Sequence, residues 1–330
     1  MSGFFQSILE WIYTWVGNYG WAIVIFTLLI RLVLLPLDIK SKKGMRAMTR
    51  VQPKVQALQK KYANDKEKLN LKLNELYRKE HVSPTAGCLP LLISMPILFI
   101  MFAAMRNMGN EQTIQMILHI METGEVPAME GWLWIKNVFQ PDSFMSTIMP
   151  TVESLKTIVA VNGSEILTEA NIAACKEFLA TPEYAAIAAQ HGADQFYRLQ
   201  LSLVFFNPIL TLPNSFSALF QYANGLFILP ILAAVSQFLM THFMNGKQSK
   251  PANGEVSPEQ EAANNAMNSG FMKWFFPLMS LYFCASYNAA FAIYWMAANV
   301  IQIIQQVLVN WYFERMDKKE AMKEDTIEIK

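Results

Sequence analysis

Long apolar runs separated by polar loops dominate this sequence. Three runs are long enough to cross a bilayer as helices, which takes roughly 20 apolar residues: 18–37, 88–108 and 225–244. A fourth, 271–313, is about twice as long and is interrupted at Tyr287 and Asn288, so we expect two helices there, 271–286 and 289–312. The sequence therefore predicts an all-α integral membrane protein with five transmembrane helices.

The composition also favours a membrane protein, because 53% of the 330 residues are hydrophobic and only 16% are charged. A net charge of +1 produces no overall field that would attract nucleic acid or an acidic partner. The three cysteines, Cys88, Cys175 and Cys284, show no C-x-x-C spacing. We therefore expect no disulfide framework, no metal site and no cofactor.

Residues 1–17 contain no Lys or Arg and are followed by no small-residue cleavage site, so they lack the features of a cleavable signal peptide. They also lack the Arg and Ser richness of an organelle transit peptide. We expect 1–17 to remain as an extracellular or interfacial segment of a protein of the bacterial plasma membrane.

The loops set the predicted orientation, because cytoplasmic loops of membrane proteins carry an excess of Lys and Arg. Residues 39–83 contain 13 Lys and Arg against 4 acids, whereas 106–224 contain 5 against 11. The first loop is thus predicted to be cytoplasmic and 109–224 to be extracellular. With 245–270 as a cytoplasmic linker, the N-terminus lies outside and the tail, 313–330, lies in the cytoplasm.

Residues 39–83 are predicted to form a charged helical hairpin, because apolar side chains recur every three or four residues in each arm. Asp65 is placed to cap the second helix, and Pro53 to kink the first. The positive charge of this hairpin is consistent with a solvated spacer. It is equally consistent with a surface that binds anionic headgroups or a ribosome and its nascent chain. The apolar positions are Met48, Val51, Val55, Leu58 and Tyr62 in the first arm and Leu69, Leu73, Leu76 and Tyr77 in the second.

The extracellular segment contains Ala-rich stretches that predict short amphipathic helices, broken at Pro182 and Gly192. The stretch 199–220 is apolar but is cut by Pro208 and Pro213, so we place it at the outer membrane interface rather than across the bilayer. If it crossed the bilayer, every later helix would be inverted.

Arg31 lies in the otherwise apolar sequence FTLLIRLVLLPLD, where a charge costs about 2.5 to 3.5 kcal/mol on insertion scales. Thr27 precedes it by one helical turn and lies on the same face, which indicates a polar stripe facing a wet cavity. The alternative is that the Arg31 side chain simply extends toward the cytoplasmic side, near Asp38.

Polar residues of other predicted helices could complete that cavity: Gln237, Tyr294, Trp295, Asn299 and Gln302. Aromatic packing by Tyr294 and Trp295, and a hydrogen bond from Gln237 to a neighbouring helix, explain these residues equally well. No Asp, Glu or His lies in the interior of a predicted span, which argues against a proton-coupled transporter and against intramembrane metal or serine catalysis. We expect no catalytic residues.

Six features occur in order along the chain within 18–145 and 225–313: the arginine of the first span, QPKVQALQKKY, AGCLPLLISMPILFIMF, GWLWIKNVFQPD, ILPILAAVSQFL and YWMAANVIQIIQQ. Together they resemble the motifs of the YidC/Oxa/Alb membrane-protein insertases. The resemblance implies a bacterial insertase, not an enzyme, with five helices around a hydrophilic groove that is closed on the outer side. It does not explain the additional residues 146–224.

By motif position, Arg31 matches the groove arginine, which attracts acidic residues of a substrate's extracellular tail, and Thr27 matches the polar residue one turn earlier. Trp295 matches an aromatic position of the last span, and Gln237 falls in the matching span. The methionines of the second span either adapt to varied substrates or pack as ordinary apolar residues; they are Met95, Met101, Met105 and Met108.

The partners that the resemblance implies are nascent or newly made membrane proteins and the Sec translocon, with the ribosome, the signal-recognition machinery and anionic phospholipids as further partners. Two alternative functions are consistent with the same sequence features. One is a small-solute or ion channel or transporter built on the same groove, and the other is a structural scaffold for assembly.

Overall fold

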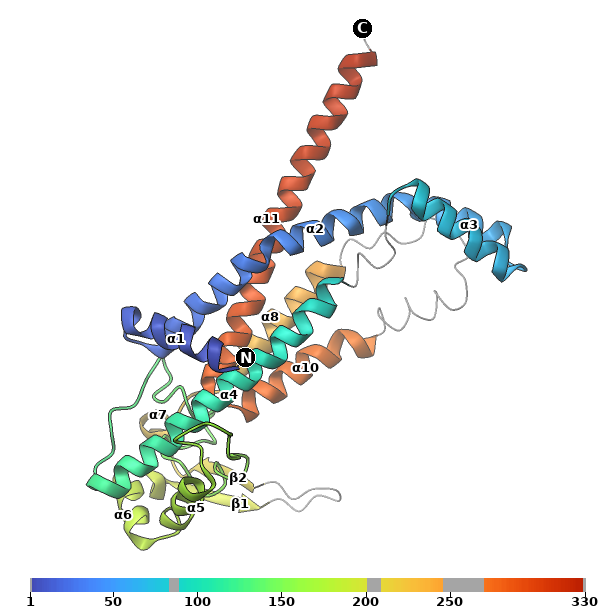
Figure 1. Ribbon diagram of the computed structural model, residues 1–330. Helices are drawn as coiled ribbons and strands as arrows, with labels where there is room; N and C mark the ends of the chain where they lie inside the picture. The colour runs from blue at the N-terminus through green and yellow to red at the C-terminus, as the bar shows by residue number, and fades with distance from the viewer. Residues whose placement is uncertain (1, 83–88, 201–208, 246–269, 329–330) are drawn as a thin grey trace. The chain divides into compact units, whose positions relative to one another are not determined.

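A computed structural model describes residues 2–82, 89–200, 209–245 and 270–328. Within these ranges the fold is mostly helical (Figure 1). Most of the predicted linker 245–270, together with Cys88 and 201–208, lies outside the described residues.

The α-helices are α1 (Ser2–Val16), α2 (Tyr19–Lys61), α3 (Lys66–Lys79), α4 (Leu89–Thr123), α5 (Glu169–Phe178), α6 (Pro182–Gln190), α7 (Phe216–Tyr222), α8 (Ile228–Asn245), α10 (Gly270–Ser286) and α11 (Ala289–Glu328). The 3-10 helix η2 (Ala193–Gln195) precedes two strands, β1 (Phe196–Gln200) and β2 (Ile209–Pro213). The strands pair antiparallel, with Phe196 opposite Pro213 and Gln200 opposite Ile209.

Several helices extend beyond the predicted spans. The α2 helix continues from 18–37 through the first arm of the hairpin, α4 continues past 88–108 to Thr123, and α11 continues to Glu328 instead of leaving 313–330 as a separate tail. Hydrogen bonding along a helix does not stop where apolar side chains do, so helix ends and membrane boundaries differ. Pro36 and Pro53 lie inside α2, and the helix continues through both.

Among the described residues, two helices are long and apolar enough to cross a membrane: α2 and the part Ala289–Met316 of α11. Two shorter apolar helical segments are Ile228–His242 and Trp274–Ser286. The break expected at Tyr287 and Asn288 is confirmed, since α10 ends at Ser286 and α11 begins at Ala289. The side chain of Asn288 accepts a 3.0 Å hydrogen bond from the backbone nitrogen of Phe291 and so caps α11.

The chain divides into two compact units. The first consists of Met1–Thr27, Phe99–Val235 and Leu278–Ala297, and the second of Leu28–Leu98, Ser236–Pro277 and Ala298–Lys330. The division falls within α2, α4, α8, α10 and α11, so these helices contribute residues to both units.

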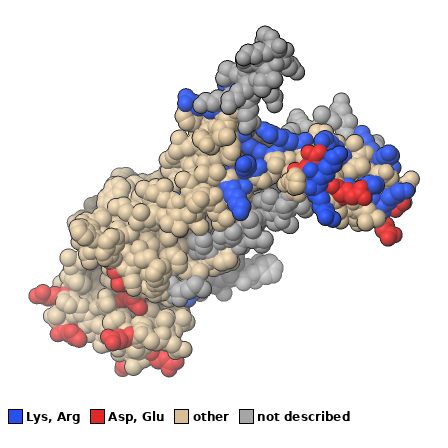
Figure 2. Space-filling model, turned by 45° about the horizontal axis from the view of Figure 1, so that its top comes forward, with Lys and Arg blue, Asp and Glu red and all other residues tan. Residues whose placement is uncertain are grey.

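The second unit contains the predicted helical hairpin, formed by the end of α2 and by α3. Val51 and Val55 are buried, and Asp65 caps α3 by accepting a 3.0 Å hydrogen bond from the backbone nitrogen of Lys68, as the sequence predicts. Lys54 donates a 2.6 Å hydrogen bond to Glu80 and joins the two arms. This bond holds the pKa of the Glu80 carboxyl below its usual range. Lys and Arg gather over the hairpin surface (Figure 2).

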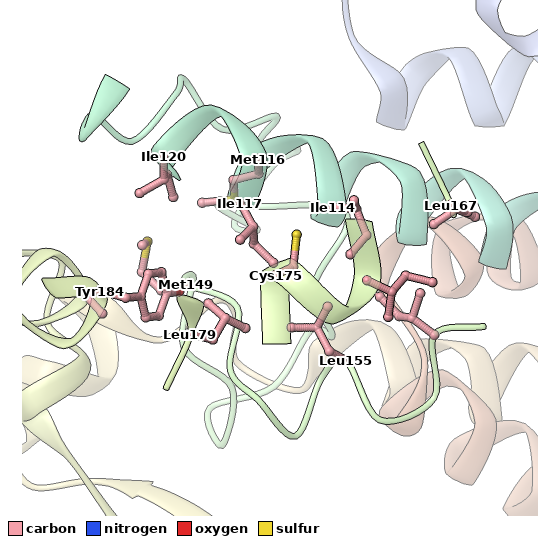
Figure 3. Close-up of a cluster of buried hydrophobic side chains, with 13 residues drawn as sticks. Ile114, Met116, Ile117, Ile120, Met149, Leu155, Leu167, Cys175, Leu179 and Tyr184 are labelled. Carbon is pink, nitrogen blue, oxygen red and sulfur yellow. The ribbon is translucent and has the colours of Figure 1, made fainter. Parts of the chain in front are cut away.

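The first unit contains a helical subdomain that packs against the last turns of α4. The short helices and their breaks are confirmed, because α5 ends at Phe178, α6 begins at Pro182, and Gly192 has a φ of +81°. Figure 3 shows apolar side chains of α4 meeting those of α5, α6 and the segments before them. The buried cluster comprises Ile114, Met116, Ile117, Ile120, Met149, Leu155, Ile158, Leu167, Ile172, Cys175, Leu179, Tyr184 and Ala188. We call residues 143–190 the α5–α6 subdomain.

A side-chain network ties the α5–α6 subdomain to α1 and α4. Glu111 of α4 accepts hydrogen bonds from Gln6 at 2.6 Å and from Ser164 at 3.1 Å. Farther along α1, the Tyr13 hydroxyl donates a 2.7 Å bond to Glu130, which raises the pKa of Tyr13 to about 12. Most of the residues 146–224, which the motifs do not explain, therefore belong to an ordered subdomain that packs against α4 and has its own apolar core.

Three methionines of α4 are packing residues. Met101, Met105 and Met108 are each at most 2% exposed. Buried thioethers fill a core and do not present an adaptable surface to other chains. Ordinary packing is therefore the better interpretation of these three side chains.

Candidate functional site

Three of the predicted groove residues lie in the first unit. Thr27 is only 2% exposed, and its hydroxyl donates a 2.7 Å hydrogen bond to the carbonyl of Ile23, one turn earlier in α2. Tyr294 is buried, and the Trp295 ring lies 5.5 Å from that of Phe291. Among the described residues, no group accepts a hydrogen bond from the buried indole nitrogen of Trp295. Trp295 therefore combines aromatic packing with an unused donor.

The other four residues that the sequence suggested for the groove, Gln302 among them, lie in the second unit. Arg31 is half-buried in α2, and Gln237 is half-buried in α8. Asn299 of α11 is buried and donates a 3.2 Å hydrogen bond to the hydroxyl of Ser236. The polar link between α8 and α11 is thus made by Ser236, one residue before the glutamine that the sequence had suggested for such a role.

A second polar link joins α2 to α11 in the same unit. The side chain of Gln305 donates a 2.7 Å hydrogen bond to Asp38, and Lys42 donates a 3.4 Å bond to the backbone carbonyl of Gln306. One turn farther along α2, the Arg46 guanidinium lies over the Phe313 ring at 4.7 Å. Asp38 therefore has a partner on α11, and these contacts begin about two helical turns beyond Arg31.

The motif GWLWIKNVFQPD, residues 131–142, forms a partly buried loop that we call the motif loop. Its last residue, Asp142, is fully buried and accepts hydrogen bonds from the backbone nitrogens of Leu229 at 2.6 Å and Phe227 at 3.2 Å. The Trp134 indole donates a further 3.2 Å bond. A carboxylate at the start of a helix is favoured by the helix dipole and by the unpaired N–H groups there. Asp142 thus fixes where α8 begins.

Asn224 provides the other half of this connection and is also fully buried. Its amide nitrogen donates to the carbonyls of Asn137 at 2.9 Å, Gln140 at 3.1 Å and Pro141 at 2.9 Å. Its amide oxygen accepts a 2.8 Å bond from the backbone nitrogen of Asn137. One asparagine therefore uses most of its hydrogen-bonding capacity to hold the motif loop.

The motif loop also holds the start of α11. The backbone nitrogens of Ala289 and Ala290 donate to the carbonyls of Gln140 at 2.9 Å and Val138 at 2.8 Å. These N–H groups belong to the first turn of a helix, where no partner exists within the helix itself. Because the same loop caps α8 through Asp142, it sets the relative positions of the two helix starts.

The motif-loop contacts were not identified from the sequence, although the motif was. The signal was a set of uncharged amides and one acid in an apolar context: Asn137, Gln140, Asp142 and Asn224. Buried polar side chains require partners, and backbone groups at helix ends are the nearest ones. In the part of the chain that the structure describes, no three His, Cys, Asp or Glu residues are close enough to hold a metal ion.

The family described as 60Kd inner membrane protein matches residues 11–176 and 184–318. This chain belongs to the 60Kd inner membrane protein family. It is accordingly a mostly helical, multi-pass membrane protein. The match includes much of 146–224, so the family likeness extends beyond the two regions in which motifs are recognisable.

Relatives of this family member carry the name membrane protein insertase YidC. The protein from Fusobacterium nucleatum is 41% identical over 130 residues, which are 39% of this chain and 55% of the relative. The protein from Chlorobaculum parvum is 27% identical over 314 residues, 95% of this chain and 36% of the relative. The protein from Chlorobaculum tepidum is 28% identical over 303 residues, 92% of this chain and 34% of the relative. This chain thus spans about a third to a half of the relatives' length.

Proposed function

We propose that this protein is a membrane protein insertase, which places newly made membrane proteins in the bilayer either alone or beside the Sec translocon. Family membership and the shared name of the relatives support this activity. The observation that carries the proposal is Arg31, a half-buried cation in a helix stretch that is otherwise apolar. A protein of this function needs no catalytic residue and no cofactor.

In this proposal, a positively charged hydrophilic groove receives the polar tail of a substrate. Its residues are Thr27, Arg31, Gln237, Tyr294, Trp295 and Asn299. The unused indole donor of Trp295 and the polar pair of Asn299 with Ser236 support the assignment. Thr27 contributes least, because its hydroxyl is already bonded within α2.

The chemistry is electrostatic and reversible. Two opposite charges at 4 Å attract by about 4 kcal/mol at an effective dielectric constant of 20, against about 1 kcal/mol in water. Arg31 therefore attracts a substrate carboxylate more strongly in a partly desolvated groove than in solution. Water in the groove keeps the pair from becoming permanent.

We further propose five spans, with the N-terminus outside the cell and α3 and the C-terminus in the cytoplasm. The positive charge of the hairpin (Figure 2) and the acidic balance of 106–224 support this orientation under the positive-inside rule. The hairpin is then available to anionic headgroups, the ribosome and signal-recognition machinery.

Reconstitution of the purified protein alone in liposomes tests the activity. A small single-span substrate synthesised outside the liposomes is expected to become protected from protease in their presence. Empty liposomes are the control for spontaneous insertion. Leakage of small solutes without any protected substrate would instead support a channel or transporter.

A further inference from the structure

The α7 helix exposes two aromatic side chains that lie one turn apart. Phe216 is 76% exposed and Phe220 is 54% exposed, with ring centroids 4.9 Å apart. Strand β1, which pairs with the strand β2 that precedes α7, exposes Tyr197 and Leu199, which are two residues apart and so lie on one face of the strand. An exposed apolar surface of this kind on a stable protein indicates a contact with another apolar phase.

The position of α7 relative to α8 is fixed within the first unit. Lys136 of the motif loop donates hydrogen bonds to the carbonyls of Phe220, at 2.9 Å, and Gln221, in the last turn of α7. Only residues 223–227 separate α7 from α8, and Asn224 among them is held by the motif loop. The end of α7 therefore lies at the level where α8 begins.

The position of α8 indicates which apolar phase α7 can contact. Its first turns expose Ile231, Leu232 and Val235, and in a multi-pass membrane protein such a helix face contacts lipid. Residues 199–241 contain no Asp, Glu, Lys, Arg or His, whereas the α5–α6 subdomain carries several acids. The uncharged segment that contains α7 thus continues in sequence into the helix α8, whose exposed apolar face contacts lipid.

We propose that α7 inserts into the headgroup region of the leaflet in which α8 begins, with Phe216 and Phe220 in contact with lipid. Aromatic side chains favour this depth, because their rings are apolar while the surroundings still provide water and polar groups. Ser217 and Gln221, on the other faces of α7, suit the polar side of that boundary. The absence of charge in 199–223 favours lipid over a protein partner selected by ion pairs. This inference depends on the membrane family and not on the insertase activity.

Site-specific fluorescence in lipid vesicles tests the contact. An environment-sensitive nitrobenzoxadiazole label is attached to the full chain at Phe216→Cys or at Phe220→Cys, in a Cys88→Ser background. Cys175 and Cys284 are buried, and labelling of the background protein measures their contribution. The control is Val159→Cys, an apolar position of the same unit that is 55% exposed on the α5–α6 subdomain.

The labels at 216 and 220 are expected to be quenched at least several-fold more by phosphatidylcholine with a nitroxide near the headgroup than by aqueous iodide. The label at 159 is expected to show the reverse. Iodide quenching at 216 and 220 equal to that at 159 would overturn the proposal. Protection from iodide without nitroxide quenching would also overturn it, since the residues would then be covered by protein. Measuring two positions separates a lipid contact from a local disturbance at one of them.

Discussion

The carboxylate of Asp142 accepts a 2.6 Å hydrogen bond from the backbone nitrogen of Leu229, in the first turn of α8. The same motif loop offers the carbonyls of Val138 and Gln140 to the first turn of α11. One short loop thereby caps two apolar helices and fixes where each begins. In the proposed topology this loop lies on the outer side of the membrane.

Replacement of Asp142 by Ala is expected to destabilise the protein. It leaves the buried N–H of Leu229 and the partly buried N–H groups of Phe227 and Trp134 without an acceptor, and the loss at a buried group costs about 1 to 3 kcal/mol. Thermal unfolding in nanodiscs should show a midpoint several degrees below that of the wild type. Asp194→Ala, at an exposed acid of the same unit, should leave the midpoint unchanged. Equal midpoints for the two variants would contradict the assigned role of Asp142.

Cys175 is expected to resist alkylation in the native protein. It is completely buried in the α5–α6 subdomain, and burial raises the pKa of its thiol to about 11. Because thiolate is the reactive form, little of it exists at pH 8 and the reagent must also reach the core. Mass spectrometry after treatment with N-ethylmaleimide should find residue 175 unmodified until denaturant is added. Rapid modification under native conditions would mean that this core is not closed.

Asp38 and Gln305 are expected to be energetically coupled, because their side chains share a partly buried hydrogen bond of 2.7 Å. A double-mutant cycle with Asp38→Ala and Gln305→Ala should yield a coupling energy of about 1 kcal/mol in unfolding experiments. The matched control pairs Asp38→Ala with Gln302→Ala, one turn earlier on α11, and should show strict additivity. Additivity in both cycles would show that the contact does not stabilise the second unit.

Local features were the ones most readily predicted from the sequence. The cap at Asp65 and the helix breaks near Pro182 and Tyr287 depend on residues within one turn, and the structure confirms each of them. The prediction of a membrane protein follows from the length of the apolar runs, which is a property of consecutive residues and does not depend on tertiary contacts. These predictions succeeded because their physical causes lie within a few consecutive residues.

Features that depend on distant residues were missed. Nothing near Asp142 in the sequence indicates that its partners are at 227 and 229, and nothing near Asp38 points to Gln305. The stretch 199–220 was expected to lie at the outer membrane interface, which stays a prediction, and the strands β1 and β2 and the short helix α7 were not identified. Strand pairing and side-chain partners arise from tertiary structure, and a single sequence does not encode them locally.

The central claim of the proposed function is that the positive charge of Arg31 attracts the acidic tail of a substrate. The most direct test of this claim is the initial rate at which the reconstituted wild type, Arg31→Lys and Arg31→Ala insert a single-span substrate with two acidic residues in its translocated tail. Arg31→Ala should lower that rate about tenfold or more, which corresponds to losing about 1.4 kcal/mol of attraction, whereas Arg31→Lys should retain most of it. A substrate whose two acids are replaced by Asn should be inserted equally well by all three proteins. Equal rates of the wild type and Arg31→Ala on the acidic substrate would contradict the account and leave Arg31 as a cation that merely reaches the membrane surface.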